Sequence, residues 1–455
     1  MNVLLLAVAL LPWAVHPASL FTRIFVAISL FSVEMQVATL TGAASLRSLV
    51  VLNAVLAAAL AAWQWRRDGP PFRGWSAALL PVAPWPIVAA LAALVLVLNV
   101  TLPLQAADPY HLDRVAQIER LGALDYDPAA DSKINIVGWL YELVLADLRQ
   151  VPVAGTWLVR LHGVLGLLLL GAALAAAQTW LPPPRSRWTL AALLVIPPLF
   201  HELVLIKNDV FLALPAFVAL VWMIVRAESA SWQDGVWAGW LVGLAIASKL
   251  TNLPLAIALV GGIAIAQRLR DWRSIGGVVL GGAIGALAGG LLFTMYANNQ
   301  WYGDPFASGP VAEMGNINEG VGEALAGIAR FGISLVDLGQ LTPRWWPGRG
   351  GWGGTFGLPV IWALGVLVLH ARLREARWAL AIATMQFLVF AAVFPDADLT
   401  HRLVLAPALV AVAVAVYLVN GQERHRRLAT VALLPVLVLT AAQILRSAML
   451  YLAAA

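Results

Sequence analysis

Long apolar runs follow one another along almost the whole chain, and each ends in a short polar segment. A helix needs about 20 apolar residues to cross the hydrocarbon core of a bilayer. The runs lack the apolar–polar alternation of barrel strands, and backbone groups in lipid must be hydrogen-bonded within the protein, so we expect helices. The pattern predicts an all-α, polytopic transmembrane protein with about 12–14 spans. The expected spans cover residues 3–15, 21–43, 48–64, 77–104, 153–178, 188–206, 210–226, 235–248, 252–267, 275–296, 356–371, 378–394, 403–420 and 428–450.

The composition supports this class. Hydrophobic residues make up 61% of the chain and charged residues only 12%, against about 25% charged residues in a soluble globular protein. We therefore expect the lipid bilayer to be the main surrounding medium. The net charge of +5 is spread over short loops, which favours membrane topology over nucleic-acid binding. The absence of cysteine excludes disulfides and thiolate metal sites.

Two long polar regions divide the apolar chain. We expect residues 1–76 to form additional N-terminal membrane helices and 77–296 to form a transmembrane core with a first outer loop at 105–150. We expect 297–355 to form a second outer loop and 356–455 to form the C-terminal spans. The first apolar run lacks the basic start and small-residue cleavage site of a signal peptide, so we expect it to be retained as a span.

Arginine clusters orient the chain. Counting the spans places all of them on one side, which the positive-inside rule makes cytoplasmic. These clusters are Arg66, Arg67 and Arg73; Arg185 and Arg187; Arg268, Arg270 and Arg273; Arg372, Arg374 and Arg377; and Arg424, Arg426 and Arg427. The same count places the unusual polar clusters on the outer side, at 105–135, 207–209, 249, 297–355 and 395–402.

The first outer loop opens with Asp108-Pro109, which is typical of a helix start, and we expect a juxtamembrane helix from Pro109 to about Leu121. Asp108 is either the cap of this helix or a general base, and the two roles are compatible. His111 lies on the same helical face, where it either packs at the interface or takes part in catalysis. We expect the other charged side chains of this segment to form a solvated face; they are Asp113, Arg114, Glu119 and Arg120.

Two abrupt polar turns interrupt the apolar core. The first is Lys207-Asn208-Asp209, and the second surrounds Lys249. One interpretation is a tight outer turn capped by Asn208 or Asp209. The other is a phosphate or sugar site, in which a lysine meets a phosphate and Asp209 holds the lysine or a sugar hydroxyl.

Residues 297–355 contain a turn signal at Gly303-Asp304-Pro305 and an amphipathic helix at 320–340 that suits the membrane surface. The tryptophans between 345 and 352 suit interface anchors better than sugar-stacking platforms. Arg402 stands at a helix start, where the macrodipole disfavours a cation. We therefore expect it to have an anionic partner, either Asp396, Asp398 or a ligand phosphate.

The order of these segments resembles that of GT-C superfamily glycosyltransferases, which include protein O-mannosyltransferases and aminoarabinose transferases. Asp108-Pro109-Tyr110-His111 resembles their first-loop acidic motif. Lys207-Asn208-Asp209 and Ser248-Lys249-Leu250-Thr251 resemble two of their turns. Tyr302-Gly303-Asp304-Pro305-Phe306 and His401-Arg402-Leu403 resemble later segments.

The resemblance implies a polyprenyl-phosphate sugar donor, an extracytoplasmic acceptor, inversion at the anomeric carbon and a bacterial inner-membrane location. It makes Asp108 and His111 the catalytic candidates. The implied substrate-binding residues are Lys207, Asn208, Asp209, Lys249, Tyr302, His401 and Arg402. The chain departs from the family in having about three extra spans before the first loop. It also has Pro109 where many members have a second acid, so no cofactor is assigned and a divalent metal stays open.

Two other kinds of protein fit parts of this pattern. A transporter or flippase is also helical, but such proteins usually show internal repeats and midplane sites, whereas here the polar clusters gather at one face. An O-antigen ligase-like or polymerase-like enzyme shares the chemistry but uses a diphosphate-linked donor.

Overall fold

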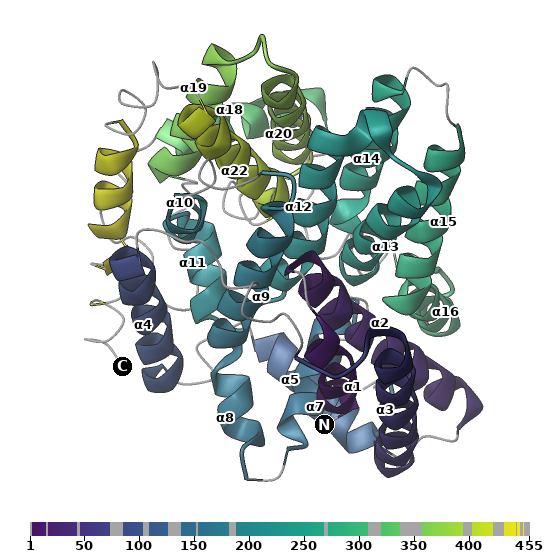
Figure 1. Cartoon of the computed structure of the whole chain (residues 1–455). Helices are drawn as coiled ribbons and strands as arrows, with labels where there is room; N and C mark the ends of the chain where they lie inside the picture. Colours follow the sequence, from purple (N-terminus) through teal and green to yellow (C-terminus); the bar gives the residue numbers. More distant parts are fainter. Residues whose placement is uncertain are drawn as a thin grey trace.

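The computed structural model describes residues 2–14, 17–42, 46–72, 85–102, 109–125, 138–151, 153–181, 188–267, 272–307, 320–336, 357–394, 403–421, 432–442, 444–445 and 449. These residues form helices and connecting turns without any strand (Figure 1), which confirms the all-α prediction. The helices are α1 (Asn2–Leu10), α2 (Pro17–Thr41), α3 (Leu46–Asp68), α4 (Trp85–Thr101), α5 (Pro109–Leu121), α7 (Leu140–Arg149), α8 (Gly155–Arg160), α9 (His162–Ala177), α10 (Thr189–Leu194), α11 (Pro197–Val204), α12 (Asp209–Arg226), α13 (Trp232–Ser248), α14 (Leu253–Ala266), α15 (Trp272–Ala288), α16 (Leu291–Tyr302), α18 (Val321–Val336), α19 (Gly357–Leu369), α20 (Arg374–Val393) and α22 (Leu405–Gly421). Short 3₁₀ turns are η1 (Leu11–Trp13), η4 (Ala227–Ser229) and η5 (Leu250–Asn252).

Among the described residues, four helices are long and apolar enough to cross a membrane, and α15 with α16 forms a fifth candidate that is bent by 56°. Most of the other expected spans are apolar helices of 10–17 residues. The bend follows Gly290, whose φ of 90° is a left-handed conformation that glycine adopts without strain. The chain is therefore a polytopic helical protein with four or five candidate membrane-spanning helices, and several of the other expected spans are shorter helices.

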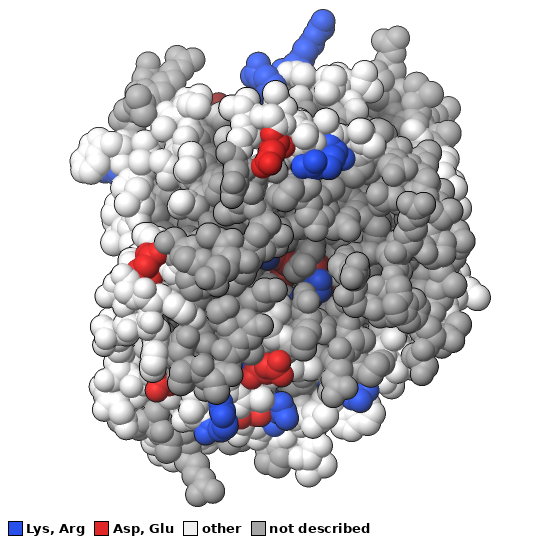
Figure 2. All heavy atoms as spheres, turned by 180° about the vertical axis from the view of Figure 1, so that it is seen from behind, with Lys and Arg blue, Asp and Glu red and all other residues white. Residues whose placement is uncertain are grey.

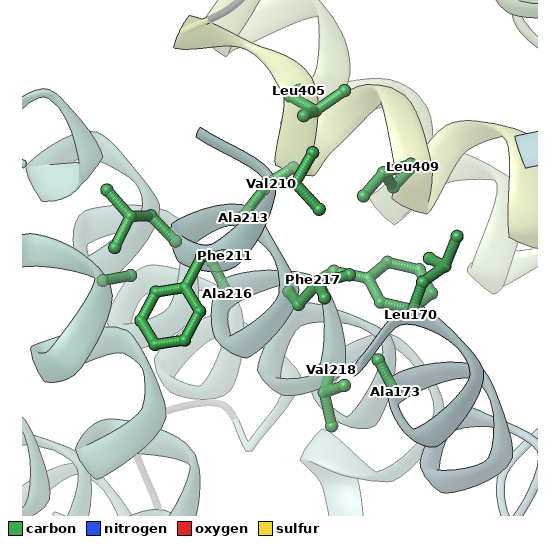
Figure 3. Packing of buried hydrophobic residues seen from close by; sticks show 14 of the residues in the cluster. Leu170, Ala173, Val210, Phe211, Ala213, Ala216, Phe217, Val218, Leu405 and Leu409 are labelled. Atoms are coloured by element: carbon green, nitrogen blue, oxygen red, sulfur yellow. The ribbon is translucent and has the colours of Figure 1, made fainter. Parts of the chain in front are cut away.

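Helix α12 lies at the centre of the bundle. It is apolar on all sides and almost wholly buried, as expected for a helix surrounded by other helices. Its neighbours include α9, α13 and α22. Figure 3 shows Phe217 and Val218 of α12 near Leu170 and Ala173 of α9. The first residues of α12 lie under α22, so the position of Asp209 is set by the packing of the core.

Glycines bring α13 and α15 into backbone contact. Gly235, Gly239 and Gly243 recur every fourth residue of α13, and Gly277, Gly281 and Gly285 do so on α15. A Cβ added at Gly281 would lie 2.0 Å from the carbonyl oxygen of Val236, and one at Gly239 would lie 2.1 Å from that of Val278. Such small-residue stripes allow membrane helices to approach closely. The contact holds α13 and α15 in a fixed relative position, and α13 ends at Ser248.

The two ends of the bundle differ in their polar contacts. At one end, Arg374 forms a 2.7 Å ion pair with Glu228, and Trp13 donates a hydrogen bond to the carbonyl of Gly69. Since Arg66, Arg67, Arg226 and Arg374 lie here, we call this the arginine end. At the other end, Asp147 of α7 accepts hydrogen bonds from the amides of Asn2 and Val3. This opposite end also holds α5, so we call it the site end. Figure 2 shows charged side chains mainly toward the top and bottom of the molecule, with one mixed group near the centre of the face.

The second polar region contains the expected amphipathic helix, α18. Phe331 on α18 contacts Phe387 on α20, with ring centroids 5.6 Å apart. The turn predicted at Gly303-Asp304-Pro305 is confirmed, since Gly303 has a φ of 69° and Asp304 Oδ1 accepts a hydrogen bond from the amide of Phe306. Residues 308–319 and 337–356, with the expected tryptophan anchors, lie outside the described residues.

The glycine contact gives a first testable expectation. Gly281→Ala should lower the unfolding free energy by about 1–3 kcal/mol, because the added methyl group overpacks the interface. Gly282→Ala on the next position is the matched control, since its Cβ would lie 3.8 Å from the nearest atom. Alanine there should be neutral or stabilising by up to about 1 kcal/mol. Thermal unfolding in detergent measures both variants, and equal effects would contradict the described contact.

Candidate functional site

A buried layer of polar side chains joins α5 to α7. Helix α5 begins at Pro109 and ends at Leu121, as predicted. His111 Nδ1 lies 2.6 Å from Glu142 Oε1, and both side chains are completely buried. Burial by itself raises the pKa of the Glu142 carboxyl, but the hydrogen bond and charge of His111 and the charge of Arg114 together hold it below its usual value. This pair fixes the first turn of α5.

Arg114 is also completely buried, so the prediction that it belongs to a solvated face is wrong. Its Nη1 donates a 3.2 Å hydrogen bond to the carbonyl of Gly138, and its guanidinium lies 4.0 Å from the ring centre of Trp139. Burial lowers the pKa of Arg114 to about 10. Within the described part of the chain, its Nε and Nη2 atoms have no hydrogen-bond partner. Asp113 and Arg120 are exposed as expected, whereas Glu119 is half-buried and lies 3.4 Å from Arg149.

Gly138 connects this layer to the core. A Cβ at Gly138 would lie 2.5 Å from the carbonyl oxygen of Ala247 and 2.6 Å from the Cα of Ser248. No other residue fits here without displacing the backbone. The layer formed by α5 and α7 is therefore seated directly on the end of α13, one residue before Lys249.

The two abrupt turns of the sequence meet in space. Lys249 Nζ lies 2.5 Å from Asp209 Oδ1, with the carboxylate almost completely buried and the lysine side chain 21% exposed. The expected tight turn is present, since Leu205–Asn208 connects α11 to α12 and Asn208 occupies the N-cap position, but the expected side-chain cap is not formed by Asn208. Its buried Oδ1 has no hydrogen-bond partner among the described residues. Lys207 is 5% exposed.

Asn99 of α4 holds the segment that leads into this turn. Its amide donates hydrogen bonds to the carbonyls of Leu203 and Val204, the last residues of α11. Its oxygen accepts a 2.9 Å hydrogen bond from the amide of Gly163. Free carbonyls at a buried helix end are costly, so this amide is well suited to end α11 just before Lys207.

A cavity of about 50 Å³ lies beside Lys207. Its polar lining comes from Tyr141, His162, Glu202 and Lys207, and its other walls are apolar. The volume admits a few water molecules but not a sugar. The pKa of Tyr141 is raised well above its usual value, first by burial and then by the charges of Glu142, Glu202 and Asp209. Charges from α7, from α11 and from the start of α12 therefore all act on this one tyrosine.

The remaining predicted site residues stay predictions. Asp108, His401 and Arg402 lie outside the described residues. Tyr302 is the last residue of α16 and is half-buried. His111 has no exposed surface in this structure, so contact with a substrate would require movement of the layer. Within the described ranges, His, Asp and Glu side chains form no group of three that could hold a metal ion.

The sequence interpretation missed Glu142, Glu202 and His162. A signal for Glu142 exists, because a lone carboxylate in the apolar segment Trp139–Leu145 is rarely buried without a partner. The partner itself could not be found, since His111 is 31 residues away in the chain.

Comparison with known families identifies the chain. A family model described as Glycosyltransferase family 87 matches residues 143–395, more than half of the sequence. The chain belongs to glycosyltransferase family 87. The matched segment includes Lys207, Asp209 and Lys249, and it begins after His111 and Arg114. No curated protein and no solved structure matches the chain. The predictions of a glycosyltransferase and of a membrane protein are thus confirmed.

The buried pair of α5 and α7 gives a second expectation. The folded state holds the pKa of Glu142 below its usual 4.5, so the stability from this contact is present above about pH 4.5 and is lost as the pH falls below it. Glu142→Gln should lower stability by about 1.5–3 kcal/mol at pH 7, and the difference from wild type should shrink toward pH 4. Thermal unfolding across this range measures it. The exposed Glu323→Gln serves as control, and a difference that does not change with pH would contradict the assignment.

Proposed function

We propose that this glycosyltransferase moves a sugar from a polyprenyl-phosphate donor to an extracytoplasmic acceptor, with inversion at the anomeric carbon. The observation that supports it best is the pairing of Lys249 with Asp209 beside the buried Lys207, at the end of the bundle opposite the arginine loops. A lysine whose charge is already oriented by a carboxylate is a suitable partner for a phosphate. The membrane helices suit a donor that is held by its lipid tail.

The proposed reaction needs one base and one phosphate site. Asp108 takes the proton of the acceptor hydroxyl, and the hydroxyl oxygen attacks the anomeric carbon. The bond from that carbon to the phosphate oxygen breaks, and polyprenyl phosphate leaves on the opposite face with the bonding electrons. Lys207, Lys249 and Arg402 would stabilise the charge that develops on the phosphate. Asn208, Tyr302 and His401 would contact the sugar.

The buried layer has a positioning role in this proposal. Asp108 directly precedes α5, and the first turn of α5 is held by His111 and Glu142. Arg114 links the same helix through Gly138 to the end of α13, where Lys249 lies. A rigid connection between the base and the phosphate site favours in-line displacement, because the two reacting groups must keep a fixed separation.

A donor assay tests the proposal directly. The purified protein in proteoliposomes is given one sugar as a polyprenyl monophosphate, a polyprenyl diphosphate or a nucleotide diphosphate, together with short polyprenols, lipids, glycans and peptides as acceptors. We expect transfer only from the monophosphate, with the opposite anomeric configuration in the product. Transfer only from the diphosphate would support the ligase-like alternative. Transfer only from the nucleotide sugar would overturn the proposed donor class.

The proposed location of the site predicts from which side of the membrane each end of the helix bundle can be labelled. Ala116 on α5 and Ser229 in η4 are exposed, and the chain has no cysteine. Cysteines introduced at these two positions in separate variants should react with a membrane-impermeant maleimide from opposite sides of the bacterial inner membrane, with Ala116→Cys labelled from outside. Arg66→Cys should be labelled from the same side as Ser229→Cys. Labelling of Ala116→Cys from the cytoplasm would contradict the proposed extracytoplasmic site.

Asp108→Asn tests the proposed base. Asparagine caps a helix about as well as aspartate but cannot accept a proton at neutral pH, and loss of a general base typically costs about 10²–10⁴-fold in rate. We expect normal unfolding temperature and donor binding with a rate reduced by that factor. Asp113→Asn, an exposed position on the same helix, should keep wild-type turnover. Full activity of Asp108→Asn would leave Asp108 as a cap only.

A further inference from the structure

A second, larger cavity lies at the arginine end, far along the bundle from Lys249. It has a volume of about 470 Å³ and opens between the start of α2, the ends of α3 and α12, and the start of α13. Its lining combines two arginines, two hydroxyls and three tryptophans. The lining residues are Leu10, Ser19, Thr22, Arg23, Val26, Gln64, Arg67, Trp180, Trp222, Asp234 and Trp237.

Arg23 is the unusual member of this lining. It belongs to α2, one of the four helices long and apolar enough to span a membrane, and it is half-buried. Its Nε donates to Ser19 and its Nη1 donates to the carbonyl of Leu10 and to Gln64. Among the described residues no carboxylate lies within ion-pair distance of Arg23. The nearest carboxylate that acts on Arg23 is that of Asp68, from outside ion-pair distance. A charge within a membrane helix is expensive, so an arginine without a direct ion pair beside a cavity points to an anionic ligand.

The carboxylates nearest this cavity are already engaged. Asp234 accepts hydrogen bonds from the amide and hydroxyl of Ser231 in the capping box that begins α13. Asp68 pairs with Arg67 at 2.9 Å. Arg23 therefore keeps positive charge for a ligand, and within the described part of the chain its Nη2 makes no hydrogen bond. A planar guanidinium of this kind suits a phosphate.

Three tryptophans form the apolar side of this cavity. The ring of Trp237 contacts the rings of both other tryptophans. Its centroid lies 5.6 Å from that of Trp180 and 6.4 Å from that of Trp222. Trp237 also donates a hydrogen bond to Thr22. Indole rings are enriched at the boundary between acyl chains and water. They would cover the glycerol and upper acyl region of a lipid whose phosphate meets Arg23.

We propose that this cavity binds the phosphate headgroup of an anionic membrane lipid, with Arg23 as the main cationic contact and the tryptophan cluster beside the acyl chains. The site is separate from the Lys207–Asp209 turn, and it stands whether or not the donor of the transfer reaction is a polyprenyl phosphate. A bound lipid would hold α2 and α3 against α12 and α13.

Native mass spectrometry of the detergent-solubilised full chain tests this proposal. After incubation with phosphatidylglycerol or phosphatidylcholine, wild type should retain one phosphatidylglycerol that phosphatidylcholine does not replace. Arg23→Gln should weaken this binding about tenfold or more, since it removes a charged hydrogen bond. Val26→Phe, which fills the cavity and keeps every charge, should weaken it too. Arg66→Gln, an exposed arginine of α3 outside the lining, should bind as wild type does.

Three results would overturn the proposal: equal retention of both lipids by wild type, wild-type affinity in Arg23→Gln, or wild-type affinity in Val26→Phe. Inorganic phosphate serves as the soluble competitor. If millimolar phosphate stabilises wild type through Arg23 while phosphatidylglycerol does not bind, the site takes free phosphate and the lipid assignment is wrong. If Arg23→Gln fails to fold, Val26→Phe and the comparison of the two lipids decide the question.

Discussion

The ion pair between Asp209 and Lys249 is the interaction on which the site depends. It joins the first residue of α12 to the residue that follows α13, so it connects the central helix to the helix fixed by glycine contacts on α15. Both groups lie in a largely apolar setting, and removing one partner of a buried pair typically costs about 3–5 kcal/mol. The pair therefore sets the distance between the two abrupt turns that carry Lys207 and Lys249.

The surrounding structure holds this pair from two sides. On one side, Asn99 ends α11 immediately before the turn at Lys207. On the other, Gly138 seats the layer of His111, Arg114 and Glu142 on the end of α13. In most of these contacts a side chain binds a backbone carbonyl. Backbone carbonyls keep their position when the side chains around a ligand move. The fold thus holds a cluster of charged side chains in fixed positions at the site end, which is the arrangement that the proposed electrostatic catalysis requires.

The sequence predicted the helices and turns better than it predicted which side chains contact one another. The pattern of apolar runs and the composition were sufficient to predict an all-α membrane protein. The dipeptide Asp108-Pro109 was sufficient to predict where α5 begins. The two abrupt turns were recognised because lysine, asparagine and aspartate are costly inside apolar runs. That Asp209 pairs with Lys249 could not be derived, since the two are 40 residues apart and several cations were available on the same face.

Arg114 shows the opposite kind of error. A charged residue on a short amphipathic helix is usually solvated, and only the position of Gly138 and Trp139 against α5 explains its burial. The close approach of α13 and α15 was likewise hidden, because a glycine at every fourth position predicts a contact face but does not name its partner. Contacts between distant segments are decided by the packing of the whole bundle.

A double-mutant cycle on Asp209 and Lys249 tests the account most directly. Asp209→Asn, Lys249→Gln and the double variant are compared with wild type for unfolding free energy and for affinity toward a polyprenyl-phosphate sugar. The account predicts that both single changes weaken stability and donor binding, and that the double variant loses less than the sum of the two, with a coupling of about 0.5–3 kcal/mol. Additive effects on stability, or folded single variants that bind the donor as wild type does, would contradict it.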